Sequence, residues 1–180
     1  MVAVVFSVAE GTEASRDWLN AQLRTSEEMY APLGVHFRMT EWRTLPTSAA
    51  NIQNRSERDA LAPLCVPQAI NVLVTSQLRD VDASEEMYRM GVTWIGRGKM
   101  YIILSTAARG STLAHEIGHY FGLHHTKVKN NLMSYDRDGG PVFLDAEQSK
   151  TVTQNARAMA LTKQLLPWSW ALPQSGPLSP

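Results

Sequence analysis

The stretch HEIGHYFGLHH, residues 115–125, decides how the rest of the sequence is interpreted. His115 and His119 are four positions apart, so on an α-helix they project from one face, about 40° apart and one turn above the other. Their imidazole nitrogens could then both reach one zinc ion at about 2.0–2.1 Å. Glu116 follows the first of these ligands, which places its carboxylate beside the metal and not on it. There it could take a proton from an activated water and later hand it to a leaving amine.

Gly122 predicts where this helix ends and how a third ligand is supplied. Because glycine has no Cβ, the chain can turn sharply there and bring His125 back toward the helix. Three neutral ligands leave a fourth position open for water, which is typical of a catalytic zinc site. The neighbouring His124 is the alternative third ligand, and we expect it to point away. A helix with ordinary core histidines is the alternative to a metal site, but five restricted positions agree with the predicted helix and its end.

This pattern resembles the signature of the metzincin zinc endopeptidases, H-E-x-x-H-x-x-G-x-x-H followed by a methionine turn. The turn is present as NLMSY, residues 131–135, with Met133 eight positions after His125. The resemblance implies that Met133 forms an apolar floor beneath the three imidazoles without binding the metal. The eight-residue interval is similar to that of the matrixins, whereas Met-Ser-Tyr is similar to the serralysin and astacin turn. In those two groups the tyrosine hydroxyl bonds the tetrahedral intermediate, which implies a catalytic Tyr135; in a matrixin-like site it is a wall of the specificity pocket.

Other features separate the chain from each metzincin subfamily. Cys65 is the only cysteine, so neither the disulfides of astacins and adamalysins nor the multi-cysteine second zinc site of archaemetzincin-type enzymes can form. The calcium-binding nonapeptides of serralysins are missing from the sequence, and structural calcium is not predicted. We expect Cys65 to be a small buried residue, not an inhibitory cysteine switch. The chain therefore resembles an outlying or minimal metzincin with no assigned subfamily.

Hydrophobic periodicity outside the motif predicts an α/β fold. Strands are expected over residues 2–9, 35–39, 69–75, 92–95 and 100–104, with a turn at 96–99 and a polar loop over 43–55. Helices are expected over residues 16–30, 56–64, 111–122 and 145–166, the last with a capping box from Asp145 to Gln148. This order is similar to the metzincin scheme, an α+β zincin fold. That scheme implies a small twisted mixed β-sheet packed on helices, an active-site helix, a methionine turn and a C-terminal helix.

One predicted strand has a further role in that scheme. Its residues are Val92, Thr93, Trp94 and Ile95. The resemblance implies that they form the antiparallel edge strand that lines the cleft and pairs its backbone with an extended substrate. A protected edge that binds no ligand is the alternative.

Length and charge limit the number of domains and the kinds of partner that the chain could have. The 180 residues suit one domain, which we divide into a metzincin-like catalytic domain over 1–166 and a proline-rich tail over 167–180. Seventeen Lys and Arg balance 17 Asp and Glu, so no charge excess points to nucleic acid or to an anionic membrane. No apolar run approaches the roughly 20 residues of a membrane span, and no signal-peptide pattern opens the chain. We expect a monomer, either a domain of a larger exported bacterial protein such as a secreted effector or toxin, or a cytoplasmic protein.

The sequence therefore favours a zinc endopeptidase with one catalytic Zn²⁺ ion and a polypeptide substrate. His115, His119 and His125 would hold the ion, and Glu116 would be the general base. One alternative is a zinc hydrolase of a non-protein amide, such as a peptidoglycan crosslink, which would use the same activated water. The other is a binding module that keeps zinc but has no turnover. Glu116 argues against the last, because a purely structural site does not need a base beside its metal.

Overall fold

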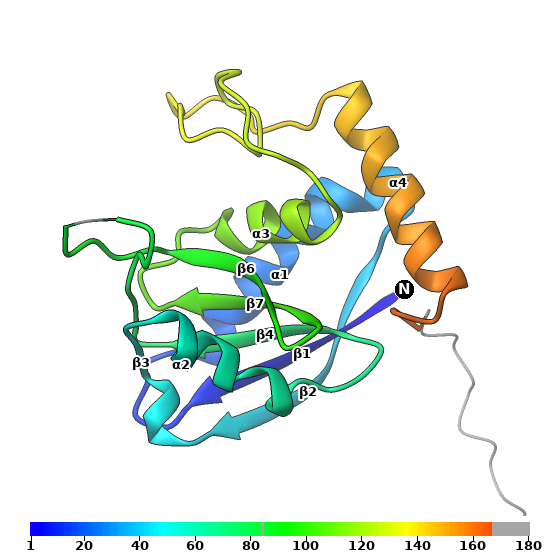
Figure 1. Cartoon of the computed structure of the whole chain (residues 1–180). Coiled ribbons are helices and arrows are strands. Elements are labelled where there is room, and N and C mark those ends of the chain that lie inside the picture. Colours follow the sequence, from blue (N-terminus) through cyan, green and yellow to red (C-terminus); the bar gives the residue numbers. More distant parts are fainter. Residues whose placement is uncertain (84, 167–180) are drawn as a thin grey trace, which may run out of the picture.

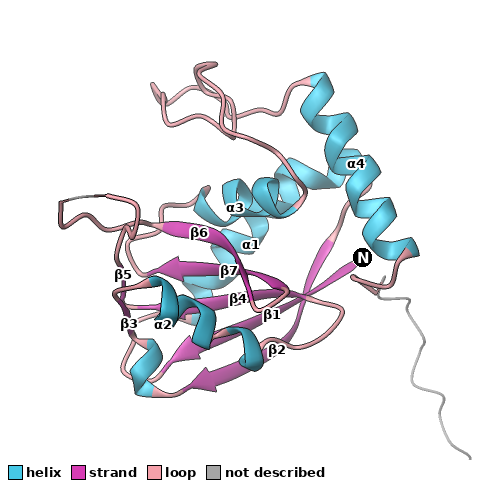
Figure 2. Ribbon diagram, viewed as in Figure 1, coloured by secondary structure: helices cyan, strands magenta, loops and turns pink. Residues whose placement is uncertain are grey.

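A five-stranded β-sheet lies at the centre of the computed structural model, which describes residues 1–83 and 85–166 (Figures 1 and 2). The strand order is β2-β1-β4-β7-β6, and every pair is parallel except β6 with β7, which is antiparallel. The five strands are β1 (Val2–Ala9), β2 (Phe37–Leu45), β4 (Ile70–Thr75), β6 (Gly91–Gly96) and β7 (Lys99–Ser105). Two short parallel strands, β3 (Asn51–Ile52) and β5 (Gln77–Leu78), pair separately. The mixed α/β fold expected from the sequence is confirmed.

Helices cover both faces of this sheet. On one face, α1 (Arg16–Tyr30) contacts α3 (Thr112–Tyr120), and α3 also contacts β6 and β7. On the other face, the short α2 (Arg55–Ala60) contacts β6. The last helix, α4 (Ala146–Leu161), stands near the end of the sheet where the chain begins (Figure 1). Three single 3₁₀ turns join these elements: η1 (Ala31–Leu33), η2 (Thr47–Ala49) and η3 (Ala62–Leu64).

The central strands are buried on both faces, which explains their continuous apolar sequence. Every residue of β4 is buried. Val72 and Val74 pack into the core beneath α1 and α3, whereas Leu73 between them packs into the core on the α2 side. Cys65 belongs to that second core and is 7% exposed, so the expected buried cysteine is confirmed.

The second strand differs from the sequence prediction. Its predicted range was 35–39, followed by a polar loop, but β2 runs from Phe37 to Leu45 and pairs with β1 along its whole length. Because β2 is the outer strand of the sheet, polar side chains such as those of Glu41 and Thr44 can remain exposed without interrupting it. The prediction of a strand here is therefore confirmed, but its polar continuation to Leu45 was missed.

The helix ends are partly as predicted. The capping box between Asp145 and Gln148 is present at the start of α4. This helix ends at Leu161 and not at residue 166, because the chain turns to positive φ (58°) at Lys163. The helix predicted over 56–64 is divided into α2 and η3, with Pro63 inside the second turn. The predicted tail, 167–180, lies outside the described residues.

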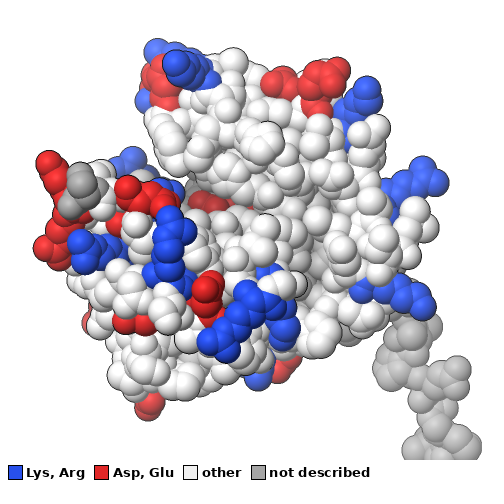
Figure 3. All heavy atoms as spheres, in the orientation of Figure 1, with Lys and Arg blue, Asp and Glu red and all other residues white. Residues whose placement is uncertain are grey.

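The surface carries charges of both signs. In the space-filling view, Lys and Arg lie among Asp and Glu (Figure 3), as the zero net charge leads one to expect. Among the described residues, no helix is long and apolar enough to cross a membrane.

Candidate metal centre

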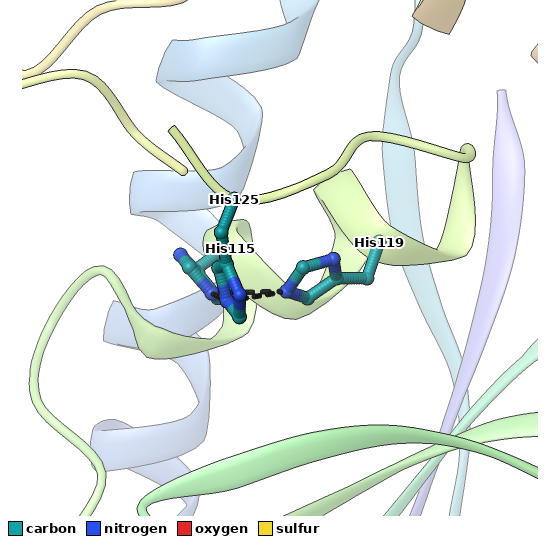
Figure 4. A group of neighbouring side chains, drawn as sticks. All are labelled: His115, His119 and His125. Atoms are coloured by element: carbon teal, nitrogen blue, oxygen red, sulfur yellow. Dashed lines mark hydrogen bonds between the residues drawn. The ribbon is translucent and has the colours of Figure 1, made fainter. Parts of the chain in front are cut away.

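Three histidines bring one nitrogen each to a common point (Figure 4). His115 and His119 project from α3, and His125 returns from the loop that follows it. The Nε2 atoms of His115 and His119 are 3.2 Å apart, and the Nε2 atom of His125 lies 3.2 Å from the first and 3.0 Å from the second. Two nitrogens bound to one tetrahedral zinc ion at about 2.0–2.1 Å would lie about 3.3–3.4 Å apart. The triangle of nitrogens is therefore close to the size that zinc requires, and slightly smaller.

Backbone carbonyls fix two of the imidazole rings. Nδ1 of His115 lies 2.8 Å from the carbonyl oxygen of Leu132, and Nδ1 of His119 lies 2.8 Å from that of Leu123. A carbonyl oxygen can only accept, so each Nδ1 carries the proton. The Nε2 atoms of both rings are then left with a lone pair, which is the form that a metal-binding histidine needs.

The protonation state of the triad supports a cation between the rings. Burial lowers the pKa of His115 to about 4 and also lowers the pKa of His119 and of His125. Neutral rings protonated at Nδ1 cannot hydrogen-bond one another through Nε2, so the contact between His115 and His119 sets lone pair against lone pair. A bound cation would turn this repulsion into attraction. The donor set thus fits zinc, and His125, which is exposed, leaves one side of the triangle open to solvent.

Gly122 makes the return of His125 possible. Its φ of +86° lies in the left-handed region that favours glycine. The N–H of Leu123 donates to the Gly118 carbonyl oxygen at 2.9 Å and closes the end of the helix in the manner of a Schellman turn. A Cβ at Gly122 would also lie 2.8 Å from Nδ2 of Asn155 in α4. The structure brings His125, and not His124, into the cluster.

Glu116 is buried beside the triad. It is 5% exposed, and this burial raises the pKa of its carboxyl group to about 7, partly opposed by hydrogen bonding from Thr93. The Thr93 hydroxyl lies 3.0 Å from Oε2 of Glu116 and 2.7 Å from its backbone oxygen, so its one proton can serve either. Gly91 permits this close approach, because a Cβ there would lie 3.0 Å from Cγ of Glu116. The carboxyl group can both take up and release a proton near neutral pH.

The predicted substrate strand is the outer strand β6, and its side chains alternate between two faces. Thr93 faces α3 and Glu116, a contact that the sequence did not predict. Val92 and Trp94 pack toward the opposite core, where Nε1 of Trp94 donates to Asp59 of α2 at 2.7 Å. Ile95 is 71% exposed. Among the described residues, β6 pairs with β7 on one side only, so no other strand occupies its outer backbone edge.

The methionine turn lies against the histidine helix. Met133 is fully buried, and a Cβ at Gly118 would come within 2.5 Å of its sulfur, so the glycine leaves room for this side chain. The Tyr135 ring is 75% exposed, and its hydroxyl lies 2.9 Å from Nε2 of His125. Desolvation raises the pKa of that phenol, which keeps it protonated and able to donate at neutral pH.

Two side chains that the sequence did not point to hold the turn in place. Arg137 donates to the carbonyl oxygens of Leu132 and Ser134, at 2.8 and 3.2 Å, and to the Ser111 hydroxyl at 3.3 Å. Asn131, fully buried, exchanges hydrogen bonds with Gln148 at the start of α4. These contacts join residues between 3 and 26 positions apart, and no repeating sequence pattern predicts them.

A cavity of about 750 Å³ adjoins the triad. Its walls are the start of β6 with the residues just before it, the beginning of α3, and the segment that follows Met133. The surface is indented between the loop after α3 and the side that carries β6 (Figure 3). A substrate group beside His115 and Glu116 would therefore have a partly enclosed space to enter.

Comparison with known proteins extends the description of the fold. No protein-family model matches the sequence, and no curated protein matches it significantly. Among solved structures, archaemetzincin from Methanopyrus kandleri is similar with a TM-score of 0.62 and 18% identity, over 87% of this chain and 96% of that one. Metalloproteinase-II from Bacteroides fragilis is similar with a TM-score of 0.59 and 15% identity, over 86% of this chain and 53% of that one. The chain thus has a zincin-like metalloproteinase fold, and it spans about half the length of the Bacteroides protein.

Proposed function

We propose that this chain is a zinc-dependent endopeptidase of the metzincin type. The observation that carries the proposal is the meeting of three histidine Nε2 atoms, 3.0–3.2 Å apart, beside a buried carboxyl group. The fold shared with two proteins named as a metalloproteinase and an archaemetzincin supports it. His115, His119 and His125 would hold one Zn²⁺ ion. When bound, zinc would act as a Lewis acid on the substrate carbonyl and would acidify water.

Glu116 would be the general base and then the general acid in this reaction. Its carboxylate would accept the proton of the attacking water and hold it on Oε1 or Oε2, and then release it to the leaving amine. Its pKa near 7 suits both halves of this transfer, because proton exchange is most effective when the pKa lies near the working pH. Thr93 would orient the carboxylate through the hydroxyl that lies 3.0 Å from Oε2.

Tyr135 would stabilise the developing oxyanion. Its hydroxyl lies at the open side of the triad, 2.9 Å from Nε2 of His125, and could instead donate to a substrate oxygen in the cleft. A hydrogen bond to a growing negative charge strengthens in the transition state, so such a contact accelerates the reaction. The free edge of β6 would align the peptide by backbone pairing.

Metal analysis and peptide cleavage together test the proposal. We expect one zinc per chain, cleavage of members of a fluorogenic peptide library, and loss of cleavage on chelation with recovery when zinc is returned. In His119→Ala, zinc content should fall well below one per chain. Full zinc retention by this variant would exclude the ligand set. A zinc-loaded protein that cleaves no peptide would contradict the endopeptidase.

A further inference from the structure

Three arginines line the cavity beside the triad. These are Arg89, Arg109 and Arg137, whereas the acidic residues among its described lining are Asp80 and Glu116. Glu116 is engaged by Thr93 and belongs to the proposed proton transfer. Apart from Glu116, the charged groups that line the cavity are therefore three guanidinium groups and one carboxylate, that of Asp80.

Arg89 is already paired within the wall. Its Nη2 atom lies 3.0 Å from Oδ1 of Asp80 and 3.5 Å from Oδ2 of Asp82. The Asp80 side chain is 17% exposed, so this pair is shielded from water on most sides. Arg89 and Asp80 therefore contribute little net charge to the cavity.

Arg109 and Arg137 are not paired in this way. Within residues 1–83 and 85–166, no ion pair joins either guanidinium to a carboxylate. The hydrogen bonds of Arg137 all go to neutral oxygens, two of them backbone carbonyls and one the Ser111 hydroxyl. Arg109 is exposed, while its backbone is held by Thr112 and by Gln22 of α1. The cavity thus keeps two uncompensated positive charges on a fixed backbone.

The direction of a bound peptide determines which of its residues meets these charges. Antiparallel pairing is the more stable of the two arrangements per residue, and an extended peptide that pairs in this way with β6 has its later residues beside Gly91, where the strand begins. The cavity begins at Glu116, which would act on the cleaved bond, and extends past Gly91 back to Tyr88, and none of residues 92–96 lines it. The cavity therefore lies on the side that receives residues after the cleaved bond.

We propose that this cavity selects an aspartate or glutamate side chain immediately after the cleaved bond, through Arg109 and Arg137. The proposal rests on the endopeptidase function above and names its substrate class. Within residues 1–83 and 85–166 the Arg109 guanidinium has no hydrogen-bond partner, and Arg137, which bonds Ser111 close to Arg109, adds a second positive charge. Charge-assisted hydrogen bonds of this kind favour glutamate over the equally shaped glutamine by about 10- to 100-fold.

Matched peptides test this selection on the zinc-loaded protein. Three peptides would differ only in having Glu, Gln or Lys after the cleaved bond, and kcat/KM would be measured for each. The wild type should favour Glu over Gln by about 10-fold or more. Arg109→Gln should lower this ratio to a few-fold, while Arg109→Glu should bring the Lys peptide ahead of the Glu peptide. A misfolded variant could not produce such a reversal.

A charge-matched control comes from α4, which contributes no residue to the cavity. Arg157 is exposed on that helix, so Arg157→Gln removes the same charge and should leave the ratio as in wild type. Equal cleavage of the Glu and Gln peptides by wild type would overturn the inference, and so would a ratio that Arg109→Gln and Arg157→Gln change alike.

Binding separates this inference from the function on which it rests. Fluorescence anisotropy with labelled versions of the same peptides, carrying a reduced bond at the cleavage position, measures selection without turnover. Tighter binding of the Glu peptide that Arg109→Gln abolishes, in a protein that cleaves nothing, would contradict the endopeptidase and support the acidic preference. Cleavage without any charge preference would contradict the cavity's role and leave the endopeptidase standing.

Discussion

The carbonyl oxygen of Leu132 accepts two of the hydrogen bonds that hold the site together. It accepts from Nδ1 of His115 and from Nη2 of Arg137, both at 2.8 Å, so one backbone atom orients a ligand ring and anchors the methionine turn. Glu116 depends in the same way on a single hydroxyl, that of Thr93. The individual roles proposed for the site residues can therefore be separated by conservative substitutions that leave these anchors intact.

Glu116→Gln separates catalysis from metal binding. The amide has nearly the same shape but cannot take up the proton, so turnover should fall by about 10²–10⁴-fold. Zinc content should remain one per chain, since Glu116 lies beside the ligands and is not one of them. Elemental analysis and peptide kinetics on the same sample measure both quantities. Zinc loss in proportion to the lost activity would mean that Glu116 is a ligand.

Tyr135→Phe tests the hydroxyl that lies 2.9 Å from Nε2 of His125. If this hydroxyl donates only in the transition state, kcat and kcat/KM should fall together by about 10-fold, with KM nearly unchanged. Steady-state kinetics of the variant and of wild type on one well-cleaved peptide measure both constants. Values within about twofold of wild type would favour a simple wall of the specificity pocket.

At the scale of elements, the site is built where α3, β6 and the segment after α3 meet. The helix supplies two of the three clustered histidines and Glu116, the strand supplies Thr93, and the following segment supplies His125 and Tyr135. Two glycines allow these elements to approach one another: Gly91 leaves room between β6 and α3, and Gly118 leaves room for Met133 of the following segment. Small changes at the junctions should therefore alter the chemistry without altering the ligands.

Thr93→Val removes the hydroxyl of β6 that faces Glu116. Burial raises the pKa of Glu116, and hydrogen bonding from Thr93 opposes this rise. Without the hydroxyl, the pKa should rise further, and activity needs the unprotonated carboxylate. The acid limb of kcat/KM against pH should therefore move to higher pH in Thr93→Val and stay near its wild-type position in Thr93→Ser. A limb that does not move in the valine variant, or that moves to lower pH, would contradict this role.

Gly122→Ala places strain at the end of α3. Alanine is disfavoured at a φ of +86°, by about 1–2 kcal/mol, and its Cβ would approach Asn155 at 2.8 Å. We expect a lower free energy of unfolding in urea and weaker zinc binding, since His125 would shift. Gly11→Ala is a matched control, because Gly11 has a φ of +79° with no atom within 4 Å of the added Cβ. It should lose similar stability yet bind zinc normally, and equal zinc affinities in the two variants would count against the role of Gly122.

At the scale of the whole molecule, zinc should stabilise the fold because its ligands come from two segments. The triad links α3 to His125, and the methionine turn links this region through Asn131 to Gln148 of α4. A ligand present at 100 times its Kd stabilises the folded state by about 2.7 kcal/mol. Calorimetry should therefore show a Tm that rises with added zinc and falls with chelator, whereas His119→Ala should respond far less. An equal rise in both proteins would indicate zinc binding elsewhere.

The parts of this molecule that local sequence could predict are those that depend on local spacing. The interval between His115 and His119 predicts a shared helix face, and the capping residues of α4 predict where that helix begins. The second half of the edge strand β2 escaped prediction because several of its polar residues are exposed to solvent, where no apolar pattern is required. Thr93 and Arg137 escaped as positioning residues because their partners lie 23 and up to 26 residues away in the chain. Only the folded structure brings residues so far apart in the chain into contact.

The free edge of β6 also has a consequence for the protein in concentrated solution. Its unpaired backbone groups would accept the β6 strand of a second molecule as readily as a peptide, which makes this edge a template for aggregation. Exposed Ile95 adds an apolar contact, and no lysine or proline lies within Gly91–Gly96 to discourage such pairing. Self-association and peptide occupancy would then compete for the same strand, so peptide ligands should act as solubilising additives during purification and crystallisation.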